Sequence, residues 1–191
     1  MSLIPVFEVG LWNAWIITVY FILIGMVPMF FIGKERKQKM GWPPFNKTEK
    51  ILALITHAVI MPVAAIYSIF LPLKLGTAWL YVGLPICFLG GVMTFTANIN
   101  IADTPLGQPF TNGVYRISRH PIYFSAFLVY FGIGIACASW LYLLFAFAWI
   151  ILWHIVLPTE ERDLVAQYGE AYREYLKRTP KWIGIPKSGR R

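Results

Sequence analysis

This chain of 191 residues has few charged side chains, a composition that excludes an ordinary soluble domain. Only 14% of its residues are charged and 58% are hydrophobic, whereas a soluble globular domain has roughly 25% charged residues. Its two cysteines, Cys87 and Cys137, show neither the spacing of a disulfide framework nor that of a zinc site. The sequence also lacks the Gly-x-Gly-x-x-Gly loop of soluble nucleotide-binding folds. No His or Glu pair stands at metal-ligand spacing, so we predict no metal site.

Long hydrophobic runs take the place of these features, at residues 11–32, 51–73, 79–101 and 122–157. As one helix the last run would be about 54 Å long, which exceeds the roughly 30 Å of a bilayer's hydrocarbon core. We therefore expect it to fold back, with the turn at Cys137–Trp140. The sequence predicts an all-α integral membrane protein with five transmembrane helices, the last two forming a helical hairpin.

The positions of the basic residues predict the topology of the chain. The net charge of +8 is compatible with nucleic-acid binding in principle. However, the Lys and Arg residues gather after the first, third and fifth predicted helices, and only Lys74 lies on the opposite side. By the positive-inside rule the N-terminus is then outside and the C-terminus cytoplasmic. The lipid bilayer, not nucleic acid, is the expected partner, and a bacterial inner membrane and the endoplasmic reticulum fit equally well.

The chain reads as a single membrane domain of two parts. Residues 1–101 form three transmembrane helices, and residues 102–191 form a loop, the helical hairpin and a cytoplasmic helical segment. Within that segment, apolar and aromatic residues recur every fourth position from Leu164 to Leu176. Pro158 is expected to end the fifth helix or begin the next one, and Gly169 to break the segment.

Two polar clusters stand at the ends of the predicted hairpin, Arg119-His120-Pro121 with Tyr123 and the pair Glu160-Glu161. Ionisable groups near membrane spans are functional-site candidates by default. Each cluster also has a simpler interpretation. Arg119 can anchor to lipid phosphate beside a helix-initiating proline, and the glutamates can balance a helix dipole.

Four further polar residues lie in or near the predicted helices. For His57 and His154 we expect hydrogen bonds between helices. Asn98 and Asn100, near the end of the third helix, either hydrogen-bond neighbouring helices or line a polar pocket.

Four motifs follow one another in a fixed order in the C-terminal part of the chain: Gly113–Arg116, Arg119–Tyr123, Glu160–Leu164 and Tyr168–Tyr175. Together they resemble the isoprenylcysteine carboxyl methyltransferase and phospholipid methyltransferase superfamily. The resemblance covers roughly residues 112–186.

The resemblance implies a membrane-embedded methyltransferase that uses S-adenosylmethionine. Its acceptor would be lipophilic or small, of the isoprenylcysteine carboxylate, phospholipid amine or thiol class, and would enter laterally from the lipid. Glu161 would contact the cofactor with Glu160 in support, and Arg119 would shape the pocket or position the acceptor. In full, the implied catalytic set is Arg119, His120 and Glu160, and the implied cofactor-binding set is Tyr115, His120, Pro121, Tyr123, Glu161 and Tyr172.

Two alternatives remain at this point. One is an NADPH-dependent membrane reductase of the sterol reductase type, whose C-terminal end looks similar. The other is a non-catalytic membrane protein of the same architecture.

Overall fold

The computed structural model describes residues 8–33 and 43–186, and in these ranges the chain is helical, without a strand. The basic residues at positions 34–39, which we predict to be cytoplasmic, lie outside the described residues. The helices are α1 (Trp15–Phe31), α3 (Lys47–Ile55), the π-helix η1 (Thr56–Ile60), α4 (Met61–Ile69), α5 (Ala78–Asp103), the 3-10 helix η2 (Gly113–Arg116), α6 (Pro121–Ala136), α7 (Trp140–Tyr168) and α8 (Glu170–Arg178).

Three helical stretches among the described residues are long and apolar enough to cross a membrane. They are residues 47–69, 78–103 and 140–168, while α1 and α6 are apolar but shorter. Large hydrophobic side chains such as Phe88 and Leu89 on α5, each 60% exposed, cover the outside of these helices. An apolar outer surface of this kind fits a lipid environment.

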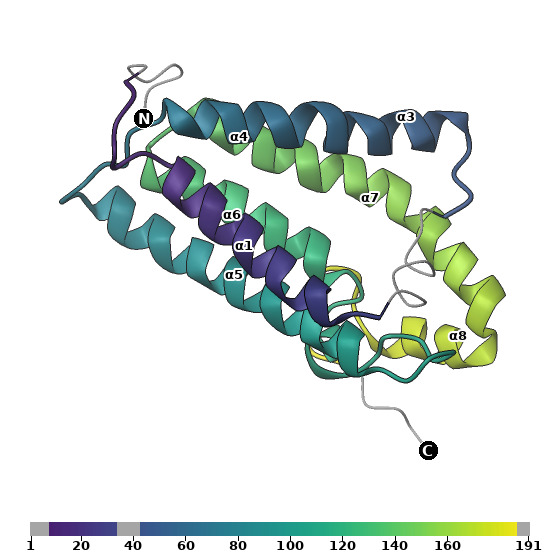
Figure 1. The fold of residues 1–191 in the computed structure, drawn as a ribbon. Coiled ribbons are helices and arrows are strands. Elements are labelled where there is room, and N and C mark those ends of the chain that lie inside the picture. Colours follow the sequence, from purple (N-terminus) through teal and green to yellow (C-terminus); the bar gives the residue numbers. More distant parts are fainter. Residues whose placement is uncertain (1–7, 34–42, 187–191) are drawn as a thin grey trace.

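Helices α5 and α6 pack closely against each other (Figure 1). Glycines allow this contact: a Cβ on Gly90 of α5 would lie 2.8 Å from Ser125 O, and one on Gly132 of α6 would lie 2.5 Å from Cys87 Sγ. A side chain at either glycine would therefore push the two helices apart. In Figure 1, α1 lies along α5, and α3 and α4 run along α7.

The predicted hairpin turn is confirmed. Helix α6 ends at Ala136 and α7 begins at Trp140, and Ala138 between them has a φ of 51°. The Ser139 hydroxyl caps α7 by accepting a hydrogen bond from Tyr142 N at 3.3 Å. A left-handed residue followed by a serine cap reverses the chain within three residues.

The prediction that Pro158 separates two helices is wrong, because α7 continues through it to Tyr168. A proline inside a helix removes the hydrogen bond to the carbonyl four residues earlier, here that of His154. That carbonyl instead accepts a hydrogen bond from Lys181 Nζ at 3.0 Å. The break expected at Gly169 is confirmed, since its φ of 60° and ψ of −132° end α7 and precede α8.

Candidate functional site

The segment that leads into α6 is held in place by α8. The Tyr175 hydroxyl donates hydrogen bonds to two backbone carbonyls, Tyr115 O at 2.7 Å and Ser118 O at 3.3 Å. Burial raises the pKa of both Tyr115 and Tyr175 above the usual value for tyrosine, so both remain neutral at pH 7. This contact positions His120, which immediately precedes α6 and is only 3% exposed.

One carboxylate oxygen of Glu161 binds both basic residues of the segment Arg119–Tyr123, which we call the box. Glu161 Oε1 lies 2.9 Å from His120 Nε2 and 3.3 Å from Arg119 Nη1. The two clusters at the ends of the hairpin are thus brought into direct contact by α6 and α7 packing side by side. A carboxylate between two basic groups fixes the orientation of the imidazole and the guanidinium.

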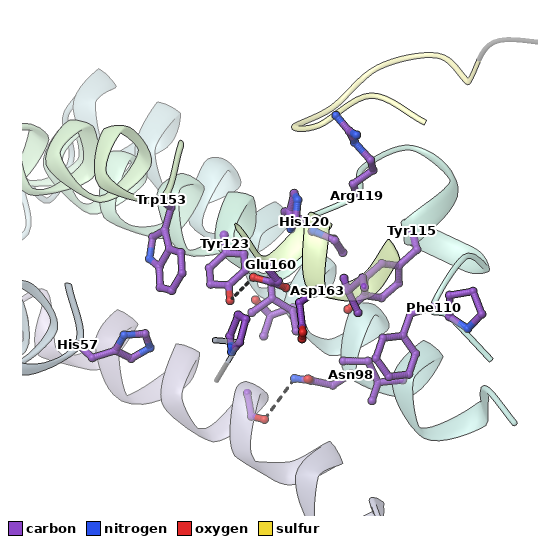
Figure 2. Close-up of a pocket in the computed structure, with 18 of the residues that line it drawn as sticks. His57, Asn98, Phe110, Tyr115, Arg119, His120, Tyr123, Trp153, Glu160 and Asp163 are labelled. Atoms are coloured by element: carbon purple, nitrogen blue, oxygen red, sulfur yellow. Dashed lines mark hydrogen bonds between the residues drawn. The ribbon is translucent and has the colours of Figure 1, made fainter. Parts of the chain in front are cut away.

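Glu160 points to a different partner. Its Oε2 accepts a hydrogen bond from the Tyr123 hydroxyl at 3.1 Å, and the labelled side chains lie together in Figure 2. Tyr123 is itself fixed by α7, because Trp149 Nε1 donates to the Tyr123 carbonyl at 3.0 Å. Its ring centroid also lies 4.0 Å from that of Trp153. The two neighbouring glutamates therefore hold two different residues of the box.

The chain beyond α8 packs behind the box as a strap, residues 179–186. Arg119 N donates to Pro180 O and Gly184 N donates to Ile117 O, both at 3.0 Å. The Trp182 indole donates to His154 Nδ1 at 3.2 Å. The sequence predicts a hydrogen bond between His154 and a neighbouring helix. In the structure its partner is instead Trp182 of the strap. Burial lowers the pKa of Lys181 in this strap.

A cavity of about 610 Å³ lies between these elements. This volume falls within the roughly 300–1,000 Å³ of small-molecule sites. Most of the predicted site residues line it: Tyr115, Arg119, His120, Pro121, Tyr123, Glu160 and Tyr172. Glu161 does not line the cavity but stands behind it, paired with Arg119 and His120. Burial raises the pKa of Tyr172, so its hydroxyl is neutral.

The cavity wall has a polar part and an apolar part. The polar part contains the box residues with Glu160, and Asp163 from the next turn of α7. The apolar part lies between three helices and includes Ile22 of α1, Met61 of α4 and Ile133 of α6. Such a cavity can hold a polar molecule beside an apolar one.

The two asparagines near the end of α5 have different roles. Asn98 lines the cavity and also donates from Nδ2 to Gly25 O of α1 at 3.3 Å. Asn100 Oδ1 instead accepts from Val114 N at 3.0 Å and thereby positions η2.

Sequence reasoning missed several lining residues, notably Trp153, Asp163 and Gln167 of α7. A helical projection of α7 gives a signal for them, because residues 153, 160, 163, 164 and 167 lie on one face at spacings of three, four and seven. No three His, Cys, Asp or Glu side chains of the described ranges gather as a metal site.

Comparison with known proteins gives the same family as the motifs. Residues 78–171 match the phospholipid methyltransferase family. Methanethiol S-methyltransferase 2 of Bradyrhizobium diazoefficiens is 37% identical over 75 residues, which are 39% of this chain and 28% of that protein. Methanethiol S-methyltransferase of Crocosphaera subtropica is 36% identical over 73 residues, which are 38% of this chain and 28% of that protein.

Both comparisons therefore show that part of this chain is similar to methyltransferases. More narrowly, residues 78–171, just under half of the chain, match the phospholipid methyltransferase family. The matched part of the chain spans little more than a quarter of the length of the two curated relatives.

Proposed function

We propose that the protein is an S-adenosylmethionine-dependent methyltransferase that acts on a lipophilic or small acceptor within the membrane. The observation that carries this proposal is a cavity whose wall joins His120, Tyr123 and Glu160 to an apolar part between α1, α4 and α6. A polar methyl donor and an apolar acceptor need such a two-part site.

The residues at the polar part fit the chemistry of S-adenosylmethionine, which carries an ammonium, a carboxylate and a sulfonium group. Glu160 supplies a carboxylate for the ammonium. Arg119 supplies a guanidinium for the carboxylate, and its Nε is buried without a hydrogen-bond partner among the described residues. The ring of Tyr123 offers an aromatic face to a cation. The bound cofactor would supply an electrophilic methyl group.

The neighbouring glutamates have different proposed roles. Glu160 lines the cavity and would contact the cofactor directly, whereas Glu161 would act through the orientation of Arg119 and His120. His120, held by Glu161, would form a wall of the cofactor site. The protein would accelerate the reaction mainly through proximity and orientation, which can contribute roughly 7–11 kcal/mol.

The acceptor would enter from the lipid into the apolar part of the cavity. The classes compatible with the family are an isoprenylcysteine carboxylate, a phospholipid amine and a thiol. The two curated relatives are named as methanethiol S-methyltransferases, which adds support for a thiol.

The proposed membrane arrangement has five spans, with α1 and α6 as the two shorter ones. The N-terminus would be outside and the C-terminus cytoplasmic, which puts the polar part of the cavity at the cytoplasmic boundary. The chain would form one membrane domain, with residues 1–101 as three spans and residues 102–191 as the cofactor-binding half.

Heat stability of the detergent-purified protein tests this function against the reductase and non-catalytic alternatives. A ligand at 100 times its dissociation constant stabilises the folded protein by about 2.7 kcal/mol. We expect a higher melting temperature with S-adenosylmethionine and with S-adenosylhomocysteine, and no change with NADPH. A shift with NADPH alone would establish the reductase alternative instead.

A further inference from the structure

Two acidic side chains of α7 line the cavity without a basic partner. Glu160 and Asp163 both belong to the wall, and their spacing of three residues places them on one face of the helix. In Figure 2 both extend from α7 into the region bounded by the other labelled side chains. The ion pairs within residues 8–33 and 43–186 include neither of them. Charges removed from water usually have a partner, so this pair indicates a cationic ligand.

Three basic residues at this end of the bundle are engaged elsewhere. Arg162 stands between the two carboxylates in sequence, but its side chain is 72% exposed and pairs with Glu49 at 3.6 Å. Lys181 Nζ donates to a carbonyl of α7 at 3.0 Å. Arg119 lines the cavity, and its charge is shared with Glu161 at 3.3 Å. The charges of the two wall carboxylates therefore remain available to a ligand.

The charged groups of the wall match those of S-adenosylmethionine in number and sign. The cofactor carries two cationic groups, the ammonium and the sulfonium, and one carboxylate. In the proposed function Glu160 binds the ammonium and Arg119 the carboxylate. Asp163 is then the remaining charged residue of the wall, and the sulfonium is the remaining charged group of the ligand.

We propose that Asp163 makes the site selective for the charge on the cofactor sulfur, so that the methyl donor binds more tightly than its product. This inference rests on the proposed function. A carboxylate stabilises a nearby cation through its charge alone, most strongly where the surroundings exclude water. The sulfonium has no N–H or O–H to donate, so it needs a partner of this kind.

The selectivity has a consequence for product release. In methyl transfer a lone pair of the acceptor forms the new bond to the methyl carbon, the S–CH3 bond breaks, and its electron pair stays on sulfur. The sulfonium thereby becomes the uncharged thioether of S-adenosylhomocysteine. Asp163 then loses its cationic partner, which weakens binding of the product and favours its exchange for a new donor.

Calorimetric titration of the full-length protein in detergent, without a methyl acceptor, tests this role. The three probes are S-adenosylmethionine, S-adenosylhomocysteine and sinefungin, whose amine-bearing carbon takes the place of the sulfonium. Asp163→Asn should raise the Kd of both cationic probes about ten-fold, as expected for losing one charge contact in a partly solvated site. The Kd of S-adenosylhomocysteine should stay within about two-fold, because its sulfur has no charge to lose.

Two further variants complete the design. Asp163→Glu keeps the charge and should keep the preference for the cationic probes. Asp103→Asn is the matched control, because Asp103 ends α5, is exposed and does not line the cavity. It makes the same change of charge and should leave all three Kd values within about two-fold.

An equal rise in the Kd of all three probes in Asp163→Asn would overturn the inference, since it would assign Asp163 to a group that donor and product share. Unchanged binding of the cationic probes would overturn it as well. Asp163→Ser serves the same comparison if Asp163→Asn does not fold. Failure of the unaltered protein to bind any of the three probes would instead refute the proposed function.

Discussion

At the scale of single residues, Glu161 joins parts of the chain that are distant in sequence. Its Oε1 contacts both Arg119 and His120, 2.9 Å from the imidazole nitrogen. His120 is 3% exposed, so its ring depends on this partner for its orientation. A residue that holds the cavity wall from behind should affect ligand binding without touching the ligand.

Replacing Glu161 with Gln should therefore weaken cofactor binding. Gln keeps an acceptor for His120 but loses the charge that holds Arg119, and hydrogen bonds to charged groups contribute about 1.5–3 kcal/mol. We expect the Kd for S-adenosylhomocysteine to rise about ten-fold, measured by calorimetry on folded protein, and a similar effect for His120→Ala. Glu170→Gln, at an exposed ion pair with Arg173, is the control. Normal binding by both site variants would refute these residue assignments.

The contact between His120 and Glu161 was accessible from sequence, because both belong to ordered motifs at the ends of one hydrophobic hairpin. The positions of His57 and Trp153 in the cavity wall could not be predicted from the sequence. Each lies inside an apolar run with no motif around it, and only the packing of η1 against α7 brings their rings to 5.5 Å. The motifs assign the cofactor contact to Glu161, whereas it is Glu160 that lines the cavity. One residue of helix rotation changes the direction of a side chain by about 100°, and the motifs do not fix that rotation.

At the scale of helices, α7 shows how a distant segment can offset a local break. The sequence indicates a helix boundary at Pro158, and the local argument is sound, since the carbonyl of His154 loses its usual partner. Lys181 Nζ, from the strap, occupies that carbonyl. No local pattern reveals this contact, because the two residues come together only when the strap folds back on α7. The turn at Cys137–Ser139 was predictable because bilayer thickness alone requires it.

The link between Pro158 and Lys181 can be measured with a double-mutant cycle. Lys181→Met should lower the free energy of unfolding by about 1 kcal/mol, because the His154 carbonyl loses its hydrogen bond. Pro158→Ala restores a backbone N–H to that carbonyl, so in this background Lys181→Met should cost less than half as much. Thermal unfolding of the four proteins in one detergent gives the coupling. Equal costs in both backgrounds would show that the lysine does not replace the missing helix bond.

At the scale of the whole molecule, the structure supports an all-helical bundle, and the number and direction of its spans are a proposal. Two loop residues at opposite ends of the bundle, Leu75 and Leu106, are both 52% exposed. The native cysteines Cys87 and Cys137 are buried, so they should react slowly with a thiol reagent.

Labelling of single cysteines in intact cells tests the orientation. With a reagent that cannot cross the membrane, Leu75→Cys should be modified and Leu106→Cys should not. After the membrane is opened, both should react. Modification of Leu106→Cys alone in intact cells would reverse the proposed topology.

The central claim is that the cavity bordered by Glu160 binds the methyl donor, and direct calorimetric titration with S-adenosylhomocysteine tests it. We predict one binding site per chain in the unaltered protein. In Glu160→Gln the Kd should rise by about 10- to 100-fold, as expected for losing a hydrogen bond to a charged group. Glu174→Gln, whose carboxylate is exposed and pairs with Arg178 at 2.7 Å, should bind normally. Absence of binding to the unaltered protein, or equal affinity of Glu160→Gln, would contradict the claim.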